Sequence, residues 1–136
     1  MKKVFISCPM KGRTTENIKK TMDKMHKCAE AALGEELEMI QSIVADTPPS
    51  GINERIWYLG ESIKFLSEAD LLVTLDTYPY GFSTSGCDIE KHVAREYGIK
   101  KFYISGDCFE YFCPDLVEKL KAESEAALVQ SGILVV

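Results

Sequence analysis

Long apolar runs are missing from this sequence. The chain has 136 residues, and no segment approaches the roughly 20 consecutive apolar residues that a membrane-spanning helix requires. The first residues lead directly into a strand-like run, without the pattern of a signal peptide. We therefore expect a cytoplasmic protein with no membrane partner.

Positive charge is also scarce. The chain has 16 Lys and Arg residues against 21 Asp and Glu residues, which gives a formal net charge of -5. Proteins that bind polymeric nucleic acid depend on clustered Lys and Arg side chains that neutralise phosphates. A nucleic-acid polymer is therefore not the expected partner, whereas a small anionic ligand needs only one local positive site.

Metal-ligating residues are few and poorly spaced. The chain has two histidines and five cysteines, and Cys108 and Cys113 are the only cysteines close together in sequence. No second pair of Cys or His residues completes a zinc site. We expect cysteines that remain thiols in a reducing compartment, and we expect neither a metal nor another cofactor.

Strand-like and helix-like segments alternate along the chain. The expected strands are Lys3–Ser7, Leu37–Val44, Leu71–Leu75, Lys101–Ser105 and Ile133–Val136. The expected helices begin at Thr14 or Thr15, at Asn53, within Gly86–Asp88 and at Pro114, and Gly34 and Gly98 end the first and third. This alternation predicts one α/β domain over residues 1–136. We expect a flavodoxin-like or Rossmann-like sheet of five parallel strands in the order 2-1-3-4-5, with helices on both faces.

The order of the strands indicates where a ligand would bind. In such sheets the site lies outside the carboxyl ends of the strands, where the strand order reverses. Here the reversal falls between the first and third strands. The loops Cys8–Thr14 and Asp76–Glu90 are therefore the expected ligand site.

The first of these loops is suited to an anion. Ser7, Lys11, Gly12 and Arg13 lie directly before a helix, whose first N–H groups and dipole attract negative charge. The spacing matches neither the dinucleotide-binding fingerprint nor the P-loop. A solvated basic turn with a threonine cap would explain the same residues, but the position in the fold favours binding.

The second loop ends in a cluster of polar residues. Asp88 and Glu90 are both expected in the first turn of the helix that follows it, where a carboxylate can act as nucleophile, general base or acceptor for a ribose hydroxyl. The alternative is that both residues only complement the helix dipole. Cys87 has no assigned base, so we interpret it as an inert thiol. Aromatic residues within Tyr78–Phe82 are candidates for stacking on a nucleobase.

Four segments, in order along the chain, resemble the nucleoside 2-deoxyribosyltransferase superfamily, which is related to nucleotide N-glycosidases. The segments are Val4–Gly12, Ala69–Val73, Ser85–Glu90 and Ala94–Lys101. The likeness is greatest to the small bacterial and phage branch of that superfamily. The resemblance implies a homodimer or larger homo-oligomer.

The resemblance also implies roles for individual residues. It makes Glu90 the catalytic residue, which attacks the anomeric carbon. The implied substrate-binding residues are Phe5, Ser7, Lys11, Gly12, Arg13, Ser62, Ser85, Gly86 and Asp88. The sequence departs from the family at two of these positions. Ser62 stands eight residues before Asp70, where active members usually have Asp, and Phe5 stands where many members have Tyr.

Together these features predict an enzyme that acts on the N-glycosidic bond of a nucleoside or nucleoside monophosphate, without a cofactor. The alternative is a non-catalytic module that binds or senses nucleotides, which the departure at Ser62 favours. A receiver-like signalling domain is a weaker interpretation. Such a domain needs an acidic cluster after the first strand, where this chain has Ser7–Pro9.

Overall fold

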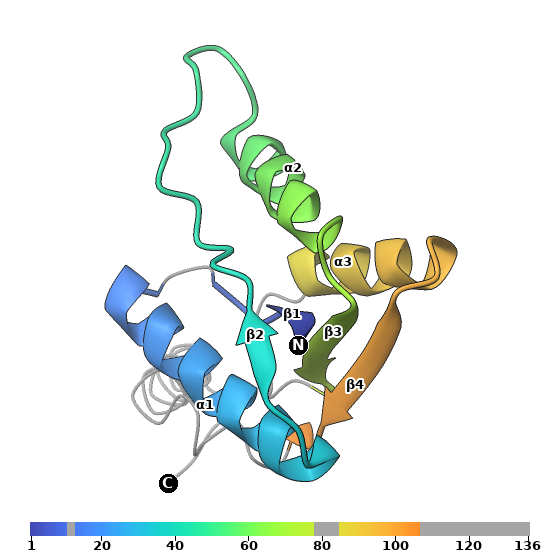
Figure 1. The fold of residues 1–136 in the computed structure, drawn as a ribbon. Helices are drawn as coiled ribbons and strands as arrows, with labels where there is room; N and C mark the ends of the chain where they lie inside the picture. The colour runs from blue at the N-terminus through green and yellow to red at the C-terminus, as the bar shows by residue number, and fades with distance from the viewer. Residues whose placement is uncertain (11–12, 78–84, 107–136) are drawn as a thin grey trace, which may run out of the picture.

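The computed structural model describes residues 1–10, 13–77 and 85–106. In these ranges the elements are β1 (Lys2–Ile6), α1 (Thr15–Leu33), β2 (Leu37–Met39), α2 (Glu54–Leu66), β3 (Leu71–Leu75), α3 (Ser85–Glu96) and β4 (Lys100–Ile104). The strands are all parallel and lie in the order β2-β1-β3-β4 (Figure 1). The predicted α/β class and the order of the first four strands are confirmed. The predicted last helix and fifth strand lie outside the described residues.

The helix ends follow from local side-chain chemistry. Thr14 caps α1, where its hydroxyl accepts a hydrogen bond of 3.1 Å from the amide of Asn17. Asn53 caps α2 in the same way: its side-chain oxygen accepts a hydrogen bond of 3.0 Å from the amide of Ile56. Gly34 ends α1 at a φ of 69°, a left-handed conformation that glycine adopts without steric cost. These predicted boundaries are confirmed.

The second strand is shorter than predicted. We expected Leu37–Val44, but β2 ends at Met39, and the amide of Ile40 makes a last hydrogen bond of 2.9 Å to the carbonyl of Val4. Among the described strands β2 pairs with β1 alone, and the chain then leaves the sheet and runs out to α2 (Figure 1). Ile43 packs against the core beside α1, so loop packing rather than strand pairing explains the apolar residues beyond Met39.

The sheet separates two layers of core side chains. On one side, Val4 and Ile6 pack with the α1 residues Ile18, Met22, Met25 and Ala29. On the other side, Phe5 packs with Leu66 of α2 and Ala94 of α3. Successive residues of a strand face opposite sides, so Ser7 continues this alternation on the side of Phe5. The chain therefore directs Ser7 towards the layer that contains α2 and α3.

α2 is the least buried of the three described helices. Leu66, at its carboxyl end, is its only fully buried residue, and the helix packs mainly against α3. Trp57 is half-buried near the other end, with its ring 5.1 Å from that of Tyr58 in an edge-on arrangement. Across the described residues, no helix has both the length and the apolar character needed to cross a membrane.

Candidate active site

Three elements bring Ser7, Ser62 and Glu90 together. Ser7 follows β1, Ser62 lies on α2 and Glu90 lies on α3. The Ser7 hydroxyl donates to Glu90 Oε1 at 2.9 Å, and the Ser62 hydroxyl donates to Glu90 Oε2 at 2.6 Å. Each oxygen of the carboxylate therefore has its own hydroxyl donor. The cluster lies at the carboxyl end of β1, the edge of the sheet at which a ligand site was predicted.

Glu90 is the only charged residue in the buried core of the described chain, with 6% of its surface exposed. A buried carboxylate is costly unless hydrogen bonds replace the lost water. Burial raises the pKa of the Glu90 carboxyl above its usual range, and the hydrogen bonds from Ser62 and Ser7 oppose that rise. The site thus holds a carboxylate whose ionisation depends on two hydroxyl groups.

The prediction that Glu90 lies in the first turn of its helix is wrong. α3 begins at Ser85, which places Glu90 in the second turn, one turn after the buried Cys87. The first-turn acid is Asp88, which is exposed and forms an ion pair of 3.5 Å with Lys91. Stabilisation of the helix dipole therefore explains why an acidic residue stands at position 88. It does not explain Glu90, which faces the core.

The backbone of Ser7 is fixed by the sheet. Its amide donates to the carbonyl of Val73 at 2.8 Å, and the residue is almost fully buried. Phe5, two residues earlier, is fully buried in the layer beneath α2 and α3. Phe5 therefore supports the site by packing, while Ser7 contributes a polar group to it.

The Arg13 side chain is bound within its own loop and helix. Its guanidinium donates to the carbonyl of Pro9 at 2.7 Å, to the carbonyl of Asn17 at 3.1 Å and to the hydroxyl of Thr21. These contacts hold the guanidinium across its own loop and the first turns of α1. Lys11 and Gly12, the other predicted residues of this loop, lie outside the described residues.

Two contacts near the site were not predicted. Arg55, in the first turn of α2, donates to the hydroxyl of Ser85 at 3.4 Å, and Gly86 follows at the start of α3. Asp76, directly after β3, accepts a hydrogen bond of 2.6 Å from the amide of Gly106, which holds the pKa of Asp76 below its usual range. A signal for the second contact was present in the sequence, because an Asp directly after a buried strand lies at the ligand-binding edge.

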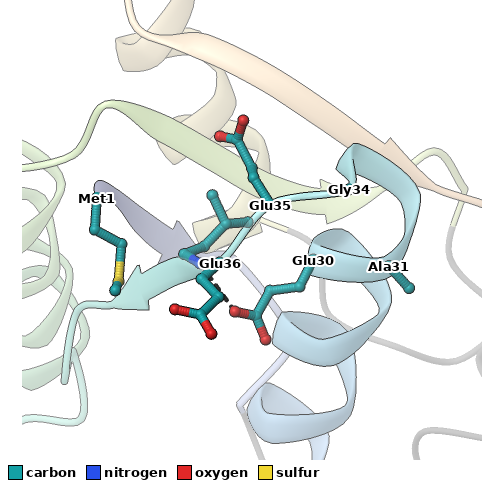
Figure 2. Close-up of a pocket in the computed structure, with 7 residues that line it drawn as sticks. Met1, Glu30, Ala31, Gly34, Glu35 and Glu36 are labelled. Carbon is teal, nitrogen blue, oxygen red and sulfur yellow. Dashed lines mark hydrogen bonds between the residues drawn. The ribbon is translucent and has the colours of Figure 1, made fainter.

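A shallow hollow of about 520 Å³ lies at the opposite end of the sheet. It is lined by Met1, Glu30, Ala31, Gly34, Glu35, Glu36 and Leu37 (Figure 2). Glu30 accepts from the amide of Leu37 at 2.9 Å, and Glu35 pairs with Lys2 at 3.4 Å. Its three glutamates make it unsuitable for a nucleotide phosphate, and it faces the amino ends of the strands. We do not assign the site to it.

The cysteines and the other candidate metal ligands form no cluster among the described residues. No group of three or more His, Cys, Asp or Glu side chains among them is arranged to hold a metal ion. Cys8, Cys28 and Cys87 are thiols, and Cys108 and Cys113 lie outside the described ranges, as do the aromatic residues of 78–82.

Comparisons of the chain with protein-family models, with curated proteins and with solved structures gave no match. A function for this chain is therefore inferred from its residues and their geometry.

Proposed function

We propose that this protein acts on the N-glycosidic bond of a nucleoside or nucleoside monophosphate, with Glu90 as the nucleophile. The observation that carries the proposal is the buried Glu90 carboxylate, held by hydroxyl groups from two other elements at the carboxyl end of β1. We further propose that residues 1–136 form a five-stranded flavodoxin-like or Rossmann-like domain of the nucleoside 2-deoxyribosyltransferase type. The likeness of Ser85–Glu90 to the glutamate motif of that superfamily supports this assignment.

The reaction needs one carboxylate and no metal or redox cofactor. An oxygen of Glu90 attacks C1′ of the sugar as the bond from C1′ to the base nitrogen breaks, through an oxocarbenium-like transition state. The base leaves with the electron pair of that bond and gains a proton. Water then attacks C1′ and loses a proton, which balances the proton that the base has gained, and the bond from C1′ to the Glu90 oxygen breaks to release the sugar and restore the carboxylate. If a second base attacks instead of water, the outcome is transfer.

The loop after β1 supports a nucleotide over a free nucleoside. In the sequence, Lys11 and Arg13 come shortly before α1, whose amino end would stabilise a 5′-phosphate. The Arg13 guanidinium already lies across this loop and the first turns of α1. The resemblance further implies a homodimer or larger assembly, which light scattering on the purified chain would measure.

The decisive test compares the wild type with Glu90→Gln on a panel of nucleosides and nucleoside monophosphates. The panel includes a 7-methylated purine nucleotide, whose cationic base leaves without needing a proton. We expect base release to fall by on the order of 10³-fold or more in the variant, because glutamine cannot form the ester. Glu96→Gln is the matched control, since Glu96 is exposed on the same helix and paired with Arg95. Base release by Glu90→Gln at the wild-type rate would overturn the nucleophile assignment.

A non-catalytic nucleotide-binding module is the second candidate. The observation in its favour is Ser62, which stands where the resemblance implies an aspartate and whose hydroxyl proton is directed to Glu90. A nucleotide that raises the melting temperature, with no base released from any member of the panel, would favour this binding role. Release of only the cationic base would instead show an intact nucleophile with no acid to protonate neutral bases.

A further inference from the structure

We infer that Ser7 and Ser62 are positioning residues, which together hold the Glu90 carboxylate in one orientation instead of binding the ligand themselves. This inference rests on the proposed role of Glu90 as nucleophile. We call Ser7 and Ser62 the serine clamp. Ser7 directly follows β1 and Ser62 lies on α2, and each holds a different oxygen of the same carboxylate.

The proton count of the hydroxyl groups favours positioning over ligand binding. A serine hydroxyl has one proton, so a hydroxyl that donates to Glu90 cannot also donate to a substrate. The Ser62 contact, at 2.6 Å, has the length typical of a hydroxyl bound to an ionised carboxylate. The clamp therefore uses both donors before any ligand arrives.

The two members of the clamp are anchored differently. Ser7 is fixed by the sheet through its amide bond to Val73, whereas Ser62 lies on α2, whose only fully buried residue is Leu66. Together they fix the plane of the carboxylate from two directions. A nucleophile oriented in advance avoids the entropy cost of orienting it in the transition state.

Charged side chains on the neighbouring elements have partners of their own. On α2, Glu61 pairs with Lys64 at 2.8 Å, and on α3, Asp88 pairs with Lys91 at 3.5 Å. The buried Cys87 thiol is the other titratable group one turn from Glu90 on α3. On the side of α2 and α3, the residues nearest Glu90 from this strand are Phe5 and, directly after β1, Ser7, which carry no charge, whereas Lys3 lies at the exposed opposite end of β1. Burial and the two hydroxyl groups therefore act on the pKa of Glu90 in opposite directions, and serine substitutions remove the second influence while leaving the first.

The test measures the pH dependence of base release for four variants. Ser7→Ala and Ser62→Ala each remove one member of the clamp, and Ser62→Thr keeps the hydroxyl. Ser67→Ala is the control, because Ser67 is exposed at the end of the same helix, and the described contact of its hydroxyl is with the carbonyl of Lys64. We expect both alanine variants to lower kcat with little change in KM. The acid limb of the kcat profile should move up by about one pH unit, the size expected for a lost hydrogen bond to a charged group.

Ser62→Thr should restore most of the wild-type profile, and Ser67→Ala should match the wild type. An unchanged acid limb in both alanine variants, with the loss confined to KM, would overturn the inference and assign the hydroxyl groups to ligand binding. A shift in Ser67→Ala equal to that in Ser62→Ala would also overturn it, since the effect would then belong to the helix as a whole.

A second measurement separates this inference from the proposed function. The melting temperature of Ser62→Ala is followed against pH, alone and combined with Glu90→Gln. A pH-dependent loss of stability that disappears in the double variant supports the clamp even if the wild type releases no base. The same pH-dependent loss in the double variant would show that Ser62 acts elsewhere. If the wild type releases base but Ser7→Ala and Ser62→Ala keep its kcat–pH profile, the proposed enzymatic function stands and the positioning role of the two serines is wrong.

Discussion

Glu90 occupies a position at which folded proteins ordinarily place an apolar side chain, because ionised carboxylates are almost never fully buried without partners. Its hydroxyl partners reduce the cost of burial without removing it, since burial remains the largest influence on the Glu90 pKa. A raised pKa means that the folded chain binds a proton more tightly than the unfolded chain. The residue therefore links the stability of the protein to pH in a predictable direction.

Substituting Glu90 by Gln should change stability in a pH-dependent way. Below the usual carboxyl pKa of 4.5, both folded and unfolded wild type are protonated at this residue, and no cost of a buried charge arises. As the pH rises through the higher pKa of the folded state, the wild type loses stability that Glu90→Gln keeps. The melting temperature of the variant relative to the wild type should therefore increase as the pH is raised above 4.5. If the difference in melting temperature between the variant and the wild type stayed constant with pH, Glu90 would titrate as an exposed carboxyl.

Arg13 should matter for stability as well as for phosphate. Arg13→Met keeps much of the side-chain volume but removes the donors to Pro9, Asn17 and Thr21, so we expect a loss of about 1–3 kcal/mol in the free energy of unfolding. Lys20→Met is the control, because Lys20 forms an exposed ion pair with Glu16, worth at most about 1 kcal/mol. Urea denaturation measures both.

Binding measurements on the same Arg13 variant address the ligand. If Arg13 also binds phosphate, Arg13→Met should weaken nucleoside monophosphate binding more than nucleoside binding. Equal losses for both ligands, together with the loss of stability, would make Arg13 a structural residue of the loop.

At the scale of elements, the carboxyl ends of β3 and β4 are joined by Asp76 and Gly106. The Asp76 amide donates to the carbonyl of Ile104 at 2.8 Å, and the Asp76 carboxylate accepts from the Gly106 amide. Gly106 packs so closely on Thr77 that a Cβ would overlap the Thr77 carbonyl oxygen and hydroxyl. The first residues after β3 are thereby held at the rim of the candidate site.

Two glycine substitutions should have opposite effects on stability. Gly106→Ala should lower the free energy of unfolding by about 1–3 kcal/mol, because the backbone of Thr77 must move to make room. Gly60→Ala, inside α2 where a Cβ meets nothing within 4 Å, should raise it by about 0.5–1 kcal/mol. Chemical denaturation of the two variants beside the wild type gives both values. A stabilised Gly106→Ala would show that the contact with Thr77 does not constrain this turn.

Helix boundaries were predictable because they depend on neighbours in the chain. Thr14, Asn53 and Gly34 each act on backbone groups within four residues, so their chemistry is visible in the sequence. The end of β2 depends on where the backbone of β1 offers partners, and the sequence of Leu37–Val44 carries no such information. The start of α3 at Ser85 similarly moved Glu90 from the expected first turn to the second.

At the scale of the whole molecule, topology made most of the candidate site predictable. The alternation of strands and helices placed β1 between β2 and β3, and this order puts the residues after β1 at the edge where ligands bind. Strand order and the family resemblance together indicated Ser7, Ser62 and Glu90 as site residues. They could not show that the hydroxyl groups bond to the carboxylate, or that Arg13 turns back onto Pro9, because both depend on side-chain packing.

Trp57 gives the molecule an intrinsic optical probe. The chain has one tryptophan, which lies half-buried on α2, five residues before Ser62, with its ring edge-on to Tyr58. Indole emission changes wavelength with the polarity around the ring, so it reports how α2 rests on the rest of the protein. Because α2 carries one of the two groups that hold Glu90, fluorescence titrations without any label can follow both ligand binding and the ionisation of the site.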